Sequence, residues 1–522
     1  MSRRRAEHTG TPRPIVAFAV VLVTAVAGCS GGSSTTHAKP SRERASAAST
    51  AIPPEVRDHA GDWPLPGFDY ANSRRAATSP INASNVSRLT PVWSVPLVAG
   101  ASTVPLVVGD TVYVEDATGT VRAIDRATGQ VRWEAGGGEF GIGPYGVAIG
   151  WGSVFATTSK GVAAYEAGTG RKLWARSLNR TPTEGVDIQP TVFGHEVLVS
   201  TVPVSLNGQF KGGDRGTVFA LDAGTGATVW SFDTVQGNDL WGNPTINSGG
   251  GAWYPPSIDV ARGVAYFGTA NPAPFAGTER FPNGSSRPGP NLYSESTIAL
   301  TTGHGALQWY YQAHPHDLFD RDFIHTMLVD VREKAGTRRI VVGTGKGGVV
   351  VGLDQTTGAL LWRTPVGVHR NDDLDALTGP TDVLPGTFGG VITPPASADG
   401  TVYVATLDEP TTLVPDAPRY IGSQLGHGDG QLVAIDAATG KVRWDVKVPG
   451  DPFGAATVVN DLVLTSNYTG TLFAYDRATG ALVWQRDMGG GINGWPAVAG
   501  DLVLVPVGAG SNPRLAALRL NP

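Results

Sequence analysis

The sequence predicts an all-β protein in which eight four-stranded sheets close into a ring. The chain of 522 residues contains 70 glycines and 38 prolines, and its apolar runs are short and rich in valine, as in strands joined by tight turns. One template ending in tryptophan occurs seven times. The final apolar segment resembles the half-repeat that the start of the series lacks. These three observations together favour a closed repeat architecture over several separate domains.

Each repeat predicts a strand, a turn and a second strand. The template is a small residue, an apolar residue, usually an acid, two variable positions, Thr-Gly, three more positions and Trp. An aspartate side chain bonds nearby backbone amides and glycine accepts a positive φ, so the centre of the template predicts a tight turn. We expect each tryptophan ring to pack between neighbouring sheets. The copies are AIDRATGQVRW (123–133), AYEAGTGRKLW (164–174), ALDAGTGATVW (220–230), ALTTGHGALQW (299–309), GLDQTTGALLW (352–362), AIDAATGKVRW (434–444) and AYDRATGALVW (474–484).

An eighth tryptophan, Trp93 in LTPVWSV, has no turn before it. The missing half lies at the other end of the chain, where RLAALRL (514–520) resembles the strand that opens each repeat. If this strand pairs beside the first one, the sequence predicts an eight-bladed β-propeller with no open sheet edge. Successive tryptophans are 40 or 41 residues apart in three steps, but 79 and 82 apart after Trp230 and Trp362. Long insertions in repeat arrays often carry function.

The N-terminus has the pattern of a bacterial lipoprotein signal. Three arginines at 3–5 precede a nearly uncharged run at 15–28, and the small residues of VAGC lead into Cys29, the only cysteine. The run is too short to be a spanning helix. We expect Cys29 to carry the lipid that anchors the chain on the extracytoplasmic side of the cell membrane. A plain secretory signal with an incidental cysteine is the alternative.

These features divide the chain into three parts. We expect a signal peptide over 1–28, a tether rich in Ser, Thr and Ala over 29–60, and the propeller over 61–522. The net charge is −5, with no basic block beyond the N-terminus. The charge pattern therefore argues against a nucleic-acid partner.

Four segments, in order along the chain, resemble the quinoprotein alcohol dehydrogenases. These are eight-bladed propellers with tryptophan-docking repeats that bind pyrroloquinoline quinone (PQQ) near the ring axis. Such repeats also occur in propellers without a cofactor, including the lipoprotein that assists outer-membrane protein assembly. The segments that carry the closer resemblance are WPLPGFDYANSRRAATSPINASNVSRLTPVWSV (63–95), GGGAWYPPSIDVARGVAYFGTANPAPF (249–275), HPHDLFDRD (314–322) and GKGGVVVGLDQTTG (345–358).

The resemblance implies a role for each matching position. Asp320 would be the general base that takes the alcohol proton, and Lys346 would hydrogen-bond the quinone oxygens. Trp253 would lie under the flat quinone ring, and Asn271 and Asp320 would ligate the metal. Asp322 resembles a second carboxylate that occurs two positions after the base in lanthanide-dependent members. Because hard cations select oxygen ligands by charge and number, this carboxylate favours a lanthanide, with calcium as the alternative.

The sequence also departs from the family pattern. The disulfide that clamps the quinone is absent, since the only cysteine is Cys29. In NGQFKGGDRGTVFALD (207–222), Lys211 stands where the family places a metal-ligating glutamate, and Asp214 is the nearest acid. A further asparagine of the family has no counterpart in 386–400. No Cys-x-x-Cys-His motif occurs, so we expect no haem and an external electron acceptor.

Each candidate residue has a structural interpretation as well. Asp320 and Asp322 suit a solvated turn, Lys346 suits a side chain that reaches solvent, and Asn271 before a proline suits a turn. Trp253 suits ordinary packing, and the loop histidines His314 and His316 suit hydrogen bonding. Two functions therefore stand side by side: a lipid-anchored PQQ-dependent oxidoreductase acting on an alcohol, and an inactive PQQ-like propeller that binds a protein partner at the cell envelope.

Overall fold

The computed structural model describes residues 52–139, 141, 143–204, 210–334, 336–417, 420–421, 425–509 and 511–521. All of them belong to the second of two compact units, Arg42–Pro522. The predicted signal peptide and Cys29 lie outside the described residues. Within the described part, no helix has the length and apolarity needed to cross a bilayer.

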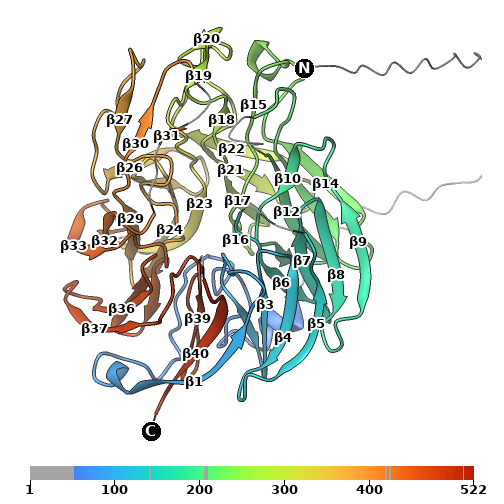
Figure 1. Cartoon of the computed structure of the whole chain (residues 1–522), viewed down its shortest axis with the longest axis vertical. Helices are drawn as coiled ribbons and strands as arrows, with labels where there is room; N and C mark the ends of the chain where they lie inside the picture. Colours follow the sequence, from blue (N-terminus) through green and yellow to red (C-terminus); the bar gives the residue numbers. More distant parts are fainter. Residues whose placement is uncertain are drawn as a thin grey trace, which may run out of the picture. The chain divides into compact units, whose positions relative to one another are not determined.

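Eight antiparallel sheets of the predicted kind form the propeller, and the ring closes as predicted. Blade 8 joins β1 from the start of the chain to β40, β39 and β38 from its end. The pairing of β1 with β40 runs from Leu89 opposite Leu520 to Pro96 opposite Arg514. Figure 1 shows the two strands, blue and red, side by side. Because β1 and β40 are paired, no sheet edge is left open where the two ends of the chain meet.

The strand bounds of the first four blades are as follows. Blade 1 contains β2 (Leu106–Val108), β3 (Thr111–Glu115), β4 (Thr120–Asp125) and β5 (Val131–Gly136). Blade 2 contains β6 (Val147–Gly150), β7 (Ser153–Thr158), β8 (Gly161–Glu166) and β9 (Lys172–Ser177). Blade 3 contains β11 (Thr191–Phe193), β12 (Glu196–Pro203), β13 (Thr217–Asp222) and β14 (Thr228–Asp233), and β10 (Glu184–Val186) also pairs with β12. Blade 4 contains β16 (Ser257–Asp259), β17 (Val264–Gly268), β21 (Ser296–Thr301) and β22 (Leu307–Gln312).

The remaining blades follow the same order from the axis outward. Blade 5 contains β23 (His325–Glu333), β24 (Gly336–Gly345), β25 (Val349–Asp354) and β26 (Leu360–Pro365). Blade 6 contains β28 (Ala396–Ala398), β29 (Thr401–Leu407), β32 (Asp429–Asp436) and β33 (Val442–Pro449). Blade 7 contains β34 (Thr457–Val459), β35 (Leu462–Ser466), β36 (Thr471–Asp476) and β37 (Leu482–Asp487). Blade 8 contains β38 (Ala497–Ala499), β39 (Leu502–Val507), β40 (Arg514–Leu520) and β1 (Leu89–Pro96).

Short elements occupy the insertions and the segment before blade 1. The helix α2 (Pro54–Arg57) lies against blade 2, where Glu55 accepts hydrogen bonds from the backbone amides of Trp151 and Gly152. The others are η1 (Val86–Arg88), η2 (Leu240–Gly242), β15 (Ser248–Gly249), β18 (Pro272–Ala273), β19 (Gly277–Thr278), β20 (Phe281–Pro282), β27 (Thr381–Val383), β30 (Thr411–Leu413) and β31 (Tyr420–Ile421). Both long insertions therefore form small sheets of their own: β15 with β18, β19 with β20, and β27 with β30 and β31.

The repeat tryptophans dock between blades, as predicted. Trp133 in blade 1 donates its indole N–H to the carbonyl of Ala167 in the turn of blade 2, at 2.9 Å. The same bond joins each following pair of blades up to Trp444, and Trp93 makes it from blade 8 to blade 1. The ring lies against the turn glycine, so a Cβ on Gly170 would be 2.6 Å from Cε3 of Trp133. Glycine is required there because its φ of +71° is left-handed and because the indole occupies the space.

The AGTG turn of blade 2 offers a matched test of this docking. We expect Gly170→Ala to lower the free energy of unfolding by about 1–3 kcal/mol, because the new methyl group collides with the indole and the backbone is left-handed. Gly168→Ala in the same turn meets no atom within 4 Å and should change stability by less than about 0.5 kcal/mol. Denaturant unfolding of both variants measures the difference, and equal losses would contradict the docking account.

Candidate active site

Connections from almost every blade meet around one cavity of about 780 Å³. They include the segments between β1 and β2, between β24 and β25, and between β37 and β38. The apolar and aromatic part of its lining is Val98, Tyr254, Phe388, Ile392, Leu425, Phe453, Tyr468, Trp495 and Val507. Trp253 and Lys346 also line this cavity. Its size and its mainly apolar wall are typical of a small-molecule site.

Lys346 forms the centre of the polar group at this cavity. It follows β24 and is only 6% exposed. Its Nζ lies 2.5 Å from Oδ2 of Asp322 and 3.1 Å from Oδ2 of Asp320. The same ammonium lies 4.9 Å from the centroid of the Trp253 ring, within cation–π range. Four of the five predicted site residues therefore meet at one point, and Lys346 does not extend into solvent.

The fifth, Asn271, joins the group through its backbone. Its amide N–H donates to Oδ1 of Asp322 at 2.6 Å, and its side-chain Nδ2 donates to the carbonyl of Pro272 at 3.1 Å. Asp322 thus bridges Lys346 and the segment that carries Asn271. Among the residues that the structure describes, no three His, Cys, Asp or Glu side chains are placed to hold a metal ion. The carboxylates that meet at Lys346 are those of Asp320 and Asp322.

Asp317 shapes the loop that presents Asp320. Its carboxylate accepts hydrogen bonds from the backbone amides of Phe319 at 2.9 Å, Asp320 at 2.7 Å and Arg321 at 3.2 Å. Asp320 adopts a φ of +63°, which is uncommon for a residue with a side chain. The turn that Asp317 stabilises holds Asp320 in this conformation, so the first of the three aspartates in HPHDLFDRD has a structural role. The loop is not a solvated turn, because Asp317 and Asp322 are buried.

Glu295 lies behind Asp317 and was not predicted from the sequence. It is fully buried. Burial and the charge of Asp317 raise its pKa well above the usual range for glutamate. Although burial acts to raise the pKa of Asp317, the charge of Arg321 and the neighbouring Glu295 carboxyl hold it below its usual range. The available signal was an acid placed directly before the largely buried strand β21.

Asp187, after β10 in blade 3, is a second residue that the sequence did not reveal. Its Oδ1 is buried without a hydrogen-bond donor among the described residues. Burial, followed by the charge of Asp322, raises the pKa of Asp187 to about 7, while Lys346 opposes the shift. Gly143 packs against it so closely that a Cβ there would overlap the carboxylate. No motif marks Asp187, because a different blade brings it to the site.

Burial decides the protonation of the central group. Burial raises the pKa of Asp320 well above its usual range and the charge of Asp322 adds to this effect, whereas Lys346 opposes both. Burial lowers the pKa of Lys346, but the charges of Asp320 and Asp322 outweigh it and raise that pKa above the ordinary value. The lysine therefore stays charged. When Asp320 and Asp322 are both ionised, the group has two carboxylates beside one ammonium, and this excess of negative charge favours a cation.

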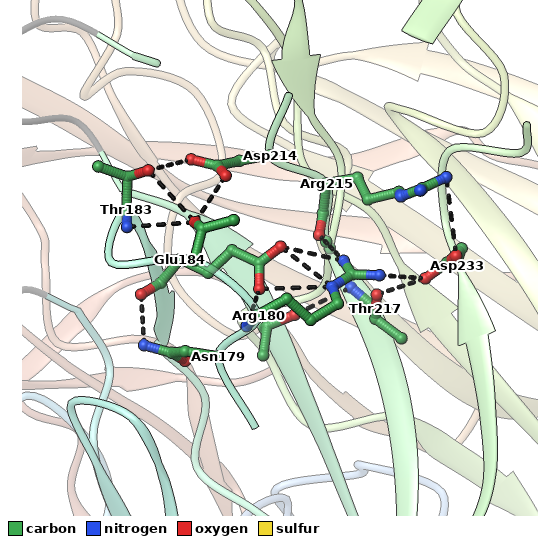
Figure 2. Close-up of polar contacts among 12 residues, drawn as sticks. Asn179, Arg180, Thr183, Glu184, Asp214, Arg215, Thr217 and Asp233 are labelled. Atoms are coloured by element: carbon green, nitrogen blue, oxygen red, sulfur yellow. Dashed lines mark hydrogen bonds and ion pairs between the residues drawn. The ribbon is translucent and has the colours of Figure 1, made fainter. Parts of the chain in front are cut away.

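The segment with Lys211 behaves differently from a metal site. Lys211 is exposed, and Asp214 is buried, with its carboxylate accepting from the hydroxyls of Thr181 and Thr183. Figure 2 shows Asp214 within a polar network that continues through Arg180, whose guanidinium lies 3.1 Å from Glu184. The carboxylate of Asp214 is thus engaged in hydrogen bonds with its neighbours at blade 3 and does not join the group around Lys346.

Two family models match the chain. One, described as the glucose/ethanol/alcohol dehydrogenase β-propeller domain, matches residues 177–368. The other, described as outer membrane protein assembly factor BamB, matches residues 83–202 and 346–520. The chain is 27% identical over 462 residues to the quinohemoprotein alcohol dehydrogenase of Comamonas testosteroni, covering 74% of this chain and 63% of that protein. The lanthanide-dependent methanol dehydrogenase of Methylacidiphilum fumariolicum is 27% identical over 464 residues, covering 74% of each.

The chain is an eight-bladed propeller with PQQ-type repeats, and it is similar to the PQQ-dependent alcohol dehydrogenases. Its fold is that of the Comamonas enzyme, with a TM-score of 0.77, 23% identity and coverage of 92% of this chain and 84% of that one. A europium-containing methanol dehydrogenase has a TM-score of 0.73 and 24% identity, covering 88% of this chain and 98% of that one. The chain spans only 50% of the length of another family member, quinohemoprotein alcohol dehydrogenase ADH IIB of Pseudomonas putida.

The buried carboxyl of Asp187 predicts a pH dependence. The pKa of Asp187 is about 7 in the folded protein, and its ordinary value is 3.8. At a pH between these two values, the folded state keeps a proton that the unfolded state has lost. Its contribution to stability is therefore full at low pH and is lost as the pH rises through 7. Asp187→Asn should remove this loss, so the variant gains stability relative to wild type between pH 4 and 8. Urea unfolding across that range measures it, and a constant difference would contradict the pKa shift.

Proposed function

We propose that this chain is an extracytoplasmic, lipid-anchored oxidoreductase that uses PQQ and a bound cation to oxidise an alcohol. The observation that carries the proposal is the contact of Lys346, which lines the cavity with Trp253, with the carboxylates of Asp320 and Asp322. Ordinary repeat packing would not require two carboxylates and an ammonium to be buried together, since burying charges is costly. The similarity to the PQQ-dependent alcohol dehydrogenases supports the same proposal, because these residues match motifs of that family.

The residues present suit a flat, negatively charged quinone. The indole of Trp253 offers an apolar surface to a ring, and the buried ammonium of Lys346 beside it can donate hydrogen bonds to quinone oxygens. The cavity of about 780 Å³ has room for such a ligand. PQQ, when bound, would supply the acceptor for the hydride of the alcohol, which carries both electrons of the oxidation. Lys346 would stabilise negative charge that develops on the acceptor oxygens.

The cation would be held by Asp320, Asp322 and Asn271. Two carboxylates and an amide are oxygen donors of the type that calcium and lanthanides prefer. Asp322 adds a charge that favours a trivalent ion, which supports lanthanide use. Lys211 does not oppose a cation here, because its side chain is exposed.

Asp320 would take the proton of the alcohol hydroxyl. Its burial raises the pKa and so strengthens it as a base, while Lys346 at 3.1 Å opposes this shift and favours the carboxylate form. Asp317 holds the loop in the conformation that presents it. The apolar wall of the cavity would exclude bulk water from the reacting hydroxyl.

The setting of this reaction rests on the N-terminal sequence. Cys29 in the VAGC box would carry the lipid that anchors the chain to the membrane on the extracytoplasmic side. An external acceptor would collect the electrons, since the sequence has no Cys-x-x-Cys-His motif for attached haem.

Cofactor binding tests the proposal directly. Titrating PQQ with lanthanum or calcium into the purified chain should raise its melting temperature, because a ligand at about 100 times its Kd stabilises the folded state by about 2.7 kcal/mol. Asp320→Ala should abolish the metal-dependent part of the shift. Asp330→Asn, a change at an exposed aspartate on β23, is the control and should retain it. No shift with either metal would favour the inactive propeller that binds an envelope protein.

Activity of the loaded protein tests Lys346 separately. Lys346→Gln should lower kcat for dye-linked alcohol oxidation by about 10²–10³-fold, as for loss of one donor to a developing oxyanion. Lys211→Gln, which removes an exposed lysine, should leave the rate within about twofold. Similar rates for the two variants would exclude the assigned role of Lys346.

A further inference from the structure

A second cavity of about 410 Å³ lies next to the loop that carries the aspartates. Its lining is polar and consists of His314, Arg321, Gly347, Arg363, Pro365, His369, Arg370, Asn371, Asp372 and Asp373. Lys346 lines the axial cavity, whereas Arg321, between Asp320 and Asp322, lines this one. The proposed function gives this second cavity no role.

Three nitrogen atoms at this cavity are buried without a hydrogen-bond partner among the described residues. They are Nε2 of His314 and both Nε and Nη2 of Arg321. Buried polar groups in proteins are almost always paired, so a cluster of unpaired ones indicates a missing ligand, ion or water.

All three nitrogens are donors. Nη1 of Arg321 lies 3.3 Å from Nδ1 of His314, and since arginine can only donate, Nδ1 accepts. Burial, followed by the charge of Arg321, lowers the pKa of His314 to about 3, so the imidazole is neutral and its one proton is on Nε2. Nε2–H of His314 therefore joins the N–H groups of Arg321 in requiring an acceptor.

The nearby carboxylates do not provide that acceptor. Asp317 lies 3.8 Å from Nε of Arg321, and Asp372 lies 4.0 Å from Nη2. Both distances allow charge attraction but exceed hydrogen-bonding length. Asp372 instead accepts from Nδ1 of His369 at 2.7 Å. This hydrogen bond with Asp372 raises the pKa of His369.

Charge and space both favour an anion. Arg321, Arg363 and Arg370 line the cavity with His369, against the two carboxylates of Asp372 and Asp373. Gly347 leaves room beside the donors, because a Cβ at this position would be 2.6 Å from Nε2 of His314. Arginine side chains bind oxyanions through paired N–H groups of the kind that are unpaired here.

We infer that this cavity is a binding site for a small oxyanion, a phosphate or a carboxylate, held by Arg321 and His314 and attracted by Arg363 and Arg370. The site requires neither PQQ nor a metal, so it stands independently of the proposed oxidoreductase function. A bound anion would accept hydrogen bonds from Arg321, which lies between Asp320 and Asp322 in the sequence.

Calorimetric titration of the purified full-length chain with inorganic phosphate tests the site. We expect saturable binding, with acetate competing if the site accepts carboxylates and no saturation by chloride at matched ionic strength. Arg321→Gln should weaken phosphate binding at least about tenfold, since a charge-assisted pair of hydrogen bonds is lost. Arg363→Gln should weaken it through lost charge. Arg338→Gln, at a residue of the same blade paired with Asp354 at 2.8 Å, is the control and should bind as wild type does.

Gly347→Ala and Arg363→Gln keep the test decisive if Arg321→Gln fails to fold. The new methyl group of Gly347→Ala would crowd the donors and should also weaken phosphate binding. Absence of saturable phosphate and acetate binding would overturn the inference and assign water to the three donors. Binding unchanged in Arg363→Gln and Gly347→Ala would overturn it as well, because the anion would then bind elsewhere.

Discussion

The docking of the tryptophans from Trp93 to Trp444 onto the next blade is the interaction on which the rest of the structure depends. One indole supplies two contacts: its N–H bonds a turn carbonyl, and its ring covers the glycine of that turn. Because the acceptor is in the following blade, the bond fixes the angle between neighbouring sheets. The same contact repeated around the ring brings the connections between blades together at the axis, and every site residue is on or beside such a connection.

The axis in turn imposes an electrostatic constraint. Asp320 and Asp322 come from one loop and Asp187 comes from blade 3, and in the folded chain all three lie within electrostatic reach of the ammonium of Lys346. Carboxylates concentrated in an apolar environment destabilise the empty protein but provide a preformed place for positive charge. The raised pKa of the buried Glu295 beside Asp317 relieves this concentration, since it favours the uncharged form of one carboxyl group.

The sequence predicted the fold well and the site in part. Repeat length, turn chemistry and the paired ends determine a ring, and these are local patterns that survive without structural context. The motif residues Asp320, Asp322, Lys346 and Trp253 do meet, as the resemblance implied. Asp187 and Glu295 could not be found this way, because each lies in an unremarkable stretch and becomes part of the site only through burial against another blade. The Arg321 cavity also needed the structure, since unpaired donors are a property of three-dimensional packing.

Closure through β1 and β40 has a consequence for biogenesis. The strand β1 is synthesised early, whereas β40, with which it pairs, is synthesised last. Leu89 is therefore made long before Leu520, the residue opposite it. While blades 1 to 7 are assembling, the growing chain therefore carries an unpaired strand that can associate with other chains. The ring becomes a single cooperative body only when its final strand is in place. A nascent or truncated chain that lacks the last strand would thus be defective at the first strand of the propeller as well.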